Sequence, residues 1–219
     1  MDDYVETVQD VPISVTAVNS DTFDALKVRD LEQLAFVAPN VTLDDVGTTR
    51  GVANFAIRGL GVNSSIPSID PTFGVFQDGV YFGINGGLVF DLFDIESVEI
   101  LRGPQGILFG RNTTGGAVLI NTTQPTDDFR YKFRTAVESP LDGDRGGPAT
   151  YIMGTVTGPI IKDKLNGKIA GYYNKDEGYF KNLFDGSNQG RAETKVLRVG
   201  LEWMATPDLT VNVNGRYFK

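Results

Sequence analysis

The chain has 219 residues, a formal net charge of −8 and 26 glycines, and it contains neither cysteine nor histidine. The missing residue types exclude thiol nucleophiles, imidazole bases and disulfides, and they remove the commonest zinc ligands. The acidic balance argues against a nucleic-acid-binding protein, which would need a basic surface. No run of 18 apolar residues occurs, so no transmembrane helix is predicted, whereas the alternating strands of a transmembrane β-barrel stay possible.

Up to Pro125 the sequence predicts a mixed α/β domain made of many short elements. Residues 11–18, VPISVTAV, are rich in β-branched residues and predict a strand. A helix is predicted next, with a cap at Ser20 or Asp21, and Pro39 ends its pattern. Four apolar residues at roughly helical spacing define its predicted buried face: Leu26, Leu31, Leu34 and Phe36.

Further along this domain, residues 54–59 predict a short strand, and residues 72–83 predict a β-hairpin. Asp78-Gly79 is its predicted two-residue turn, because this dipeptide accepts the positive φ that such turns require. Residues 92–103 predict a short helical turn followed by another strand.

A burst of glycines then separates two apolar strands. Its members are Gly103, Gly106, Gly110, Gly115 and Gly116. No lysine follows them as in a Walker loop, and the G-x-G-x-x-G spacing of a dinucleotide site is absent, so the burst does not indicate phosphate binding. We interpret these glycines as points where the backbone needs positive φ or close approach of another chain segment.

After Pro125 the sequence alternates between apolar and polar residues. Four segments do so clearly, residues 129–139, 165–174, 197–203 and 209–217, and residues 150–160 form a weaker fifth. Each segment therefore predicts a strand with one apolar and one polar face. The clearest apolar faces consist of Phe129, Tyr131, Phe133, Thr135 and Val137; of Leu197, Val199, Leu201 and Trp203; and of Leu209, Val211, Val213, Gly215 and Tyr217.

This alternation fits both a membrane β-barrel and a soluble β-sandwich. Two features favour the barrel: aromatic residues lie near the strand ends, and the connections alternate between long and short. The long connections, residues 139–149 and 175–191, would then be outer loops. The two interpretations differ in what contacts the face of Phe129, Tyr131 and Phe133, which is lipid in a barrel and a second sheet in a sandwich.

The stretch VEILRGPQGILFGRNTTGGAVLINTTQP, residues 98–125, closely resembles the plug-domain signature of TonB-dependent outer-membrane receptors. The segments DVPISVTAV, DLEQLAFVAPNV, FAIRGLG and VFQDGVY resemble the same domain in the same order. Downstream, GPIIKDKLNGKIAGYYNKDEGYFKN is similar to the second and third strands of the family's barrel. The resemblance implies an α+β plug domain, residues 1–125, followed by antiparallel β-strands of an incomplete transmembrane β-barrel, residues 126–219.

About five strands cannot close a barrel, so the sequence is expected to be a fragment of a longer chain or a truncated product. The acidic start Met1-Asp2-Asp3 does not resemble a signal peptide. The family's TonB box is expected further upstream than this chain extends. The segment Val5–Val8 is only superficially similar to it and suits a linker better.

The resemblance implies a receptor in the outer membrane of a Gram-negative bacterium that imports a scarce ligand, most often a ferric siderophore. Haem, cobalamin and some oligosaccharides are other ligands of the family. Its partners would be TonB, the small ligand and outer-membrane lipid, with no nucleic acid, no cofactor and no enzymatic activity. No residue is expected to be catalytic. No residue is expected to bind a metal either, because Asp142-Gly143-Asp144 lacks the full spacing of a calcium loop.

Arg58 and Arg102 resemble the paired plug arginines that bind barrel carboxylates, and a local ion pair with Glu96 or Glu99 is the alternative. Arg111 is expected at a contact between plug and barrel wall. The resemblance places ligand contacts in residues 61–72 and 81–88, where the candidates are Asn63, Ser64, Ser65, Tyr81, Phe82 and Asn85.

The rival interpretation is a soluble glycine-rich β protein that binds glycans or another protein at a cell surface. A hydrolase is disfavoured, because the sequence has no G-x-S-x-G motif and no histidine base.

Overall fold

The structure is a computed structural model that describes residues 14–26, 28, 31–45, 53–61, 71–82, 93–140 and 146–219. The chain divides into unit 1, residues 1–123, and unit 2, residues 124–219. Among the described residues, no helix is both long enough and apolar enough to span a membrane.

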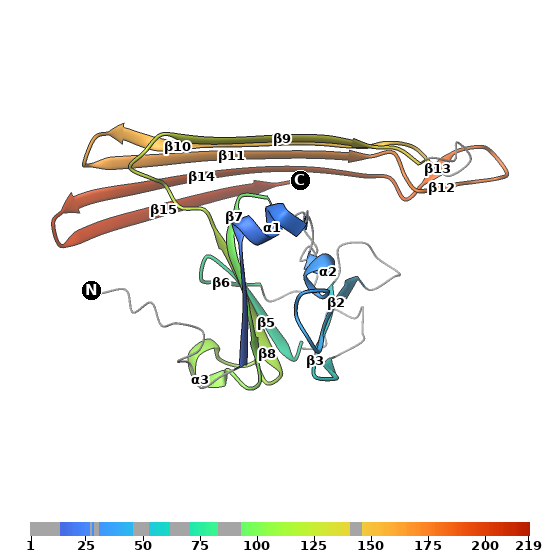
Figure 1. Cartoon of the computed structure of the whole chain (residues 1–219), viewed down its shortest axis with the longest axis horizontal. Helices are drawn as coiled ribbons and strands as arrows, with labels where there is room; N and C mark the ends of the chain where they lie inside the picture. The colour runs from blue at the N-terminus through green and yellow to red at the C-terminus, as the bar shows by residue number, and fades with distance from the viewer. Residues whose placement is uncertain are drawn as a thin grey trace. The chain divides into compact units, whose positions relative to one another are not determined.

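Unit 1 is built around a five-stranded sheet with the strand order β1-β7-β8-β5-β6 (Figure 1). All neighbouring strands are antiparallel except β5 and β8, which are parallel. The strands are β1 (Ser14–Asn19), β5 (Phe73–Gln77), β6 (Val80–Phe82), β7 (Ile95–Arg102) and β8 (Gly116–Thr122).

The described residues of unit 1 also form a smaller antiparallel sheet and three short helices. The sheet consists of β2 (Val41–Asp45), β3 (Ala53–Ile57) and β4 (Leu60–Gly61), and the helices are α1 (Ser20–Leu26), α2 (Leu31–Leu34) and α3 (Gly106–Phe109). One apolar core joins the two sheets with α1 and α2, and its fully buried members include Leu34, Leu43, Ile57, Val98, Ile100 and Val118.

The predicted single helix after β1 is wrong, because the structure has two helices, α1 and α2. Its predicted buried face is also only partly right: Leu34 is buried, but Leu26 is exposed and Phe36 is 91% exposed. Phe23 and Val28 supply the buried contacts instead, and the Val28 amide donates to the Phe23 carbonyl at 3.0 Å. Because α1 and α2 are separate helices, the apolar residues of the two do not follow one continuous helical spacing.

The cap of α1 is Asn19, one residue before the predicted candidates. Its side-chain oxygen accepts hydrogen bonds from the amide (3.0 Å) and the hydroxyl of Thr22. This is the usual geometry of an N-cap, which binds an amide of the first turn.

Local turn chemistry predicts the hairpins of unit 1 better. Asp78 (φ 50°) and Gly79 (φ 77°) form the predicted turn between β5 and β6. The strand predicted over residues 54–59 corresponds to β3, which ends at Ile57, and a similar two-residue turn of positive φ follows it. The helical turn expected before β7 is absent from residues 93–102, where the strand begins at Ile95.

Two of the predicted glycine positions show close approach directly. A Cβ on Gly116 would overlap the carbonyl oxygen of Leu101 across the β7–β8 ladder. At Gly115 it would overlap the ring of Phe73. These glycines therefore let β8 lie close to both of its neighbours.

Unit 2 is a five-stranded antiparallel sheet with the strand order β15-β14-β11-β10-β9, which agrees with the predicted strands. The strands are β9 (Arg130–Glu138), β10 (Ala149–Ile161), β11 (Leu165–Asp176), β14 (Ala192–Thr206) and β15 (Leu209–Phe218). A small hairpin, β12 (Phe180–Lys181) with β13 (Asn188–Gln189), lies in the long connection between β11 and β14.

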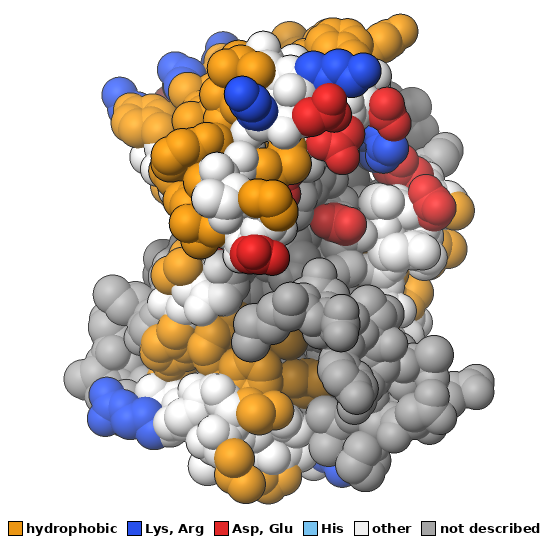
Figure 2. All heavy atoms as spheres, turned by 90° about the vertical axis from the view of Figure 1, so that its left-hand side faces the viewer, with side chains coloured by type: hydrophobic (Ala, Val, Ile, Leu, Met, Phe, Trp, Pro, Cys, Tyr) orange, Lys and Arg blue, Asp and Glu red, His pale blue; other side chains and the backbone are white. Residues whose placement is uncertain are grey.

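Register brings the apolar faces of these strands onto one side of the sheet. Tyr131 pairs with Val156, Val156 with Ile169, and Ile169 with Val199. Phe129, Tyr131 and Phe133 are 71%, 77% and 69% exposed, so no second sheet covers them among the described residues. Figure 2 shows the resulting hydrophobic side chains gathered over unit 2. The observed exposure disfavours a sandwich.

The close approach at Gly116 gives a stability prediction. Gly116→Ala should destabilise unit 1 by about 2–3 kcal/mol, because the new methyl group overlaps a backbone carbonyl that cannot rotate away. The measurement is hydrogen exchange of the β7 and β8 amides. Gly106→Ala is the matched control, since a Cβ there meets nothing within 4 Å. Equal exchange in the two variants would contradict the explanation.

Candidate functional site

The topology of unit 1 places the ends of several strands at the same end of the main sheet. Ser14 pairs with Arg102, Arg102 with Gly116, and Gly116 with Phe73. The loop of residues 103–115, which contains α3, therefore closes the end of the sheet at which β5 begins (Figure 1).

Backbone hydrogen bonds fasten the loop of residues 103–115. Gly103 donates to the carbonyl of Gly115 at 3.0 Å, and Gln105 donates to that of Thr113 at 2.9 Å. Gly115 in turn donates to the carbonyl of Thr72 at 2.9 Å. The Thr113 side chain is fully buried and its hydroxyl donates to the carbonyl of Gly110. Although the loop is fastened, α3 leaves Ile107 and Leu108 exposed to solvent.

An aromatic cluster connects this loop to the β5–β6 hairpin. The Phe76 ring lies 5.2 Å from that of Tyr81 and 4.9 Å from that of Phe109. The Asn112 side-chain amide donates a hydrogen bond to the Tyr81 hydroxyl at 3.1 Å. The cluster thus presents a half-exposed phenol beside an amide, which together can stack on a flat ligand and form hydrogen bonds with it.

The predicted ligand residues divide into three groups. Tyr81 belongs to the aromatic cluster. Phe82 is partly buried and packs on the core of unit 1. Asn63, Ser64, Ser65 and Asn85 lie outside the described residues, although their segments adjoin the start of β5 and the end of β6. Sequence reasoning did not include Phe109 and Asn112, whose pairing with the hairpin depends on strand register.

The two arginines lie close enough to influence each other. Burial, followed by the positive charge of Arg58, lowers the pKa of the Arg102 guanidinium, which still stays protonated. Arg102 donates to the hydroxyl of Ser14 at 2.6 Å and to that of Thr16. Within the described residues neither arginine has an ion pair, so the alternative of a local pair with Glu96 or Glu99 is not formed.

Arg58 also has an unusual backbone. With φ of 53° it is the first residue of a two-residue turn between β3 and β4, and Gly59 with φ of 77° is the second. Left-handed backbone is costly for a residue with a long side chain. Arg111 is exposed in the loop that follows α3, next to Asn112.

The described part of the chain contains no group of three or more acidic side chains placed to hold a metal ion. The aromatic cluster of Phe76, Tyr81 and Phe109, with the Asn112 amide, is separate in kind from the guanidinium groups of the three arginines.

The profile of the TonB-dependent Receptor Plug Domain family matches residues 7–117, just over half of the chain. The chain belongs to this family. This confirms the resemblance drawn from the quoted segments. Proteins of the family are outer-membrane proteins of Gram-negative bacteria, and this chain has the same location.

Curated relatives extend the similarity beyond the plug domain. The probable TonB-dependent siderophore receptor PirA of Acinetobacter baumannii is 26% identical over 215 residues, which cover 91% of this chain and 28% of the relative. The pesticin receptor of Yersinia pestis is 28% identical over 176 residues, which cover 80% of this chain and 24% of that protein. The chain thus spans about a quarter of the length of these relatives.

Solved structures share the fold of the chain. The ferric yersiniabactin uptake receptor FyuA of Yersinia pestis matches with a TM-score of 0.79 at 24% identity, over 93% of this chain and 31% of that one. The ferripyoverdine receptor of the outer membrane of Pseudomonas aeruginosa matches with a TM-score of 0.76 at 19% identity, over 97% and 26%. The predicted fold class is confirmed: a plug domain followed by antiparallel strands, which form an open sheet here.

The strained turn at Arg58 gives a second prediction. Arg58→Gly should stabilise unit 1 by about 1 kcal/mol, because glycine adopts the left-handed backbone freely and the repulsion on Arg102 disappears. Urea unfolding measures the change in the free energy of unfolding, and hydrogen exchange of the β3 amides measures the change locally. Arg111→Ala removes the same charge from an ordinary backbone and should change stability by less than about 0.5 kcal/mol. A destabilised Arg58→Gly variant would refute the strain argument.

Proposed function

We propose that the chain is part of an outer-membrane receptor that takes up a ferric siderophore, with energy supplied through TonB. Membership of the plug-domain family supports this, as do relatives described as a siderophore receptor and an iron-regulated outer membrane virulence protein. The observation that carries the proposal is a plug domain followed directly by a sheet with one exposed apolar face. No covalent chemistry is part of the proposed function.

The proposed domain boundary follows Pro125, with a plug domain before it and barrel strands after it. The division of the chain after Thr123 supports this boundary. The apolar face of unit 2 is then the surface that contacts outer-membrane lipid, with Tyr131 and Trp203 near strand ends, where interfacial aromatic residues are found.

The ligand is proposed to contact unit 1 at the aromatic cluster and at the predicted residues Asn63, Ser64, Ser65 and Asn85. Tyr81 offers a ring for stacking, and Asn112 holds its hydroxyl in place. Arg58, Arg102 and Arg111 are proposed to act differently, by holding the plug domain against carboxylates of the receptor wall. The exposed charge of Arg58, and the absence of ion pairs at Arg58 and Arg102 within the described residues, support this role for these two arginines.

Ligand binding gives a direct test of the aromatic cluster. Tyr81→Ala and Asn112→Ala should each weaken binding of a ferric siderophore about 5- to 10-fold, the loss expected for one hydrogen bond or stacking contact. Isothermal titration of the chain in detergent with ferric yersiniabactin, ferripyoverdine and ferrioxamine B measures the affinities. Tyr217→Ala, on the apolar face of unit 2, is the control. The cluster is not the site if the control and the two variants bind equally.

Lipid contact can be tested with two neighbouring residues of β10 that point to opposite faces. Val156→Arg should weaken partitioning into lipid vesicles by about 2–4 kcal/mol, because the charge lies on the apolar face. Thr155→Arg, on the polar face, should have little effect. Quenching of the single tryptophan, Trp203, by brominated lipids reports insertion. Equal losses in the two variants would support a soluble protein instead.

A further inference from the structure

Unit 2 carries charged side chains at one end of its apolar face. On β14 the side chains of residues 197–203 that lie on this face are all apolar, and the preceding two positions on the same side are Lys195 and Glu193. On β11 Tyr173 pairs with Lys195, and Lys175 pairs with Glu193. The apolar face therefore ends in charged residues, at the end of the sheet where the long connection between β11 and β14 begins.

These charged side chains form an alternating array. The Lys175 ammonium lies 2.5 Å from the Glu177 carboxylate, and the Lys195 ammonium lies 2.7 Å from the Glu193 carboxylate. Electrostatic attraction also joins Arg191 to Glu177, and Lys175 to Glu193. The order of charges is therefore Arg191, Glu177, Lys175, Glu193 and Lys195, with a cation at each end and one positive charge in excess. We call these five residues the charge array.

An aromatic ring lies at the boundary between the charge array and the apolar face. The Lys195 ammonium is 5.6 Å from the centroid of the Tyr173 ring. Tyrosine combines an apolar ring with a polar hydroxyl, which suits the boundary between lipid hydrocarbon and headgroups. About half of the Lys175 and Lys195 side-chain surface is exposed, 53% and 51%, so a ligand outside the protein can reach both ammonium groups.

The folding of unit 2 does not account for the charge array, because an exposed ion pair contributes at most about 1 kcal/mol. On the lipid side of a barrel, a cation costs about 2–4 kcal/mol at the bilayer midplane but only about 0–1 kcal/mol near the headgroups. The apolar stretch of residues 197–203 spans about 20 Å at about 3.3 Å per residue, which approaches the apolar band of about 25 Å in membrane barrels. With this face in lipid, the array lies at the depth of the headgroups.

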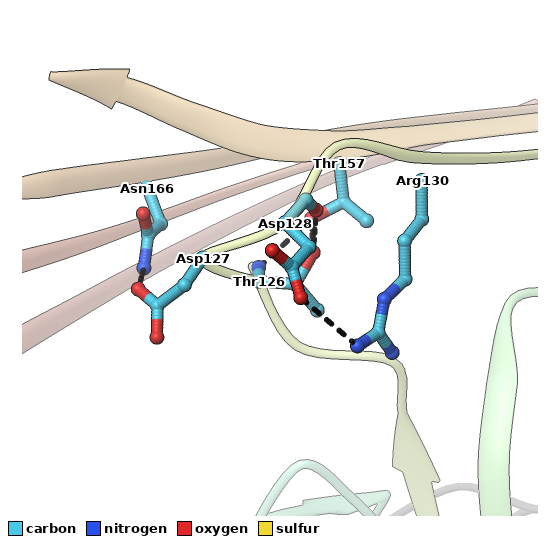
Figure 3. A network of polar contacts seen from close by, with 6 residues as sticks. All are labelled: Thr126, Asp127, Asp128, Arg130, Thr157 and Asn166. Carbon is cyan, nitrogen blue, oxygen red and sulfur yellow. Dashed lines mark hydrogen bonds and ion pairs between the residues drawn. The ribbon is translucent and has the colours of Figure 1, made fainter. Parts of the chain in front are cut away.

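At the opposite end of the sheet, charged contacts occur on the polar face instead (Figure 3). The side-chain amide of Asn166 donates to the Asp127 carboxylate at 2.8 Å, and the Arg130 guanidinium lies 3.8 Å from the Asp128 carboxylate. Strand register places Arg130 and Asn166 on the polar side, whereas the apolar side at this end carries Trp203. The two ends of the apolar face therefore differ, one aromatic and the other charged.

We propose that the charge array binds the headgroups of anionic, phosphate-bearing lipids, with Lys175, Arg191 and Lys195 as the groups that contact phosphate oxygens. Ammonium and guanidinium groups form charge-assisted hydrogen bonds with phosphate. A half-exposed ion pair is weak, so a phosphate can compete with the carboxylates of Glu177 and Glu193 for these cations. The site rests on the lipid contact of the proposed function and adds to it a preference for one class of lipid.

The test compares partitioning of the full 219-residue chain into two kinds of vesicle, phosphatidylcholine alone and phosphatidylcholine mixed with phosphatidylglycerol. Fluorescence of the single tryptophan, Trp203, measures partitioning. Combining Lys175→Gln with Lys195→Gln should lower the ratio of the mixed to the pure partition coefficient about 10- to 30-fold, as expected for two lysines near an anionic surface. Glu193→Gln should raise this ratio about fivefold, because it removes a competing negative charge.

The matched control combines Arg130→Gln with Lys132→Gln, which removes two positive charges from the polar face of β9. It should change the ratio less than about twofold, since charges remote from the headgroups are screened. Equal losses in the two double variants, or no loss in either, would overturn the proposal.

Partitioning into phosphatidylcholine alone separates this proposal from the proposed function. All variants should partition there equally, because the apolar face is unchanged. If the unaltered chain does not partition into either kind of vesicle, the lipid contact of the proposed function is wrong, and the headgroup site is wrong with it. If the chain partitions but the ratio is insensitive to Lys175 and Lys195, only the headgroup site is wrong.

Discussion

Strands β7 and β8 form the antiparallel ladder that positions Arg102 and the loop of residues 103–115 in unit 1. β7 pairs on its other side with β1, and β8 pairs on its other side with β5. The side chains of Val98, Ile100 and Val118 on this ladder are fully buried. One end of the ladder carries Arg102 and the loop of residues 103–115, and the other carries Thr122 and the exit to unit 2. A small shift of this register would separate the aromatic cluster and change where the chain leaves the unit.

Unit 2 depends on a different constraint, the two-residue period of its strands. Five strands pair so that apolar side chains meet on one face and polar side chains on the other, where Asn166, Lys168 and Arg198 are buried. In water the exposed apolar face would be an aggregation surface. The same face is stable against lipid, where only the polar groups need protein partners. The fold of unit 2 and its proposed environment therefore follow from one pattern.

What the sequence predicted well is local. The turn at Asp78-Gly79 and the strands of unit 2 follow from positive-φ dipeptides and from alternation, both of which act between near neighbours. The prediction of the helix after β1 was wrong, because Phe23 and Val28 pack in the core whereas Leu26 and Phe36 do not. The spacing of apolar residues along the sequence does not show which of them the tertiary structure buries. The bonds from Asn112 to Tyr81 and from Asn166 to Asp127 join residues 31 and 39 positions apart, and no spacing rule connects them.

Two local features cost stability. Arg58 keeps a left-handed backbone beside a second guanidinium, although glycine or a neutral residue would fold more easily. Asn166 keeps a buried unpaired oxygen, although an apolar residue would avoid it. Departures of this kind are expected where a residue serves more than folding. The first is the exposed guanidinium that is proposed to bind a carboxylate of the receptor wall.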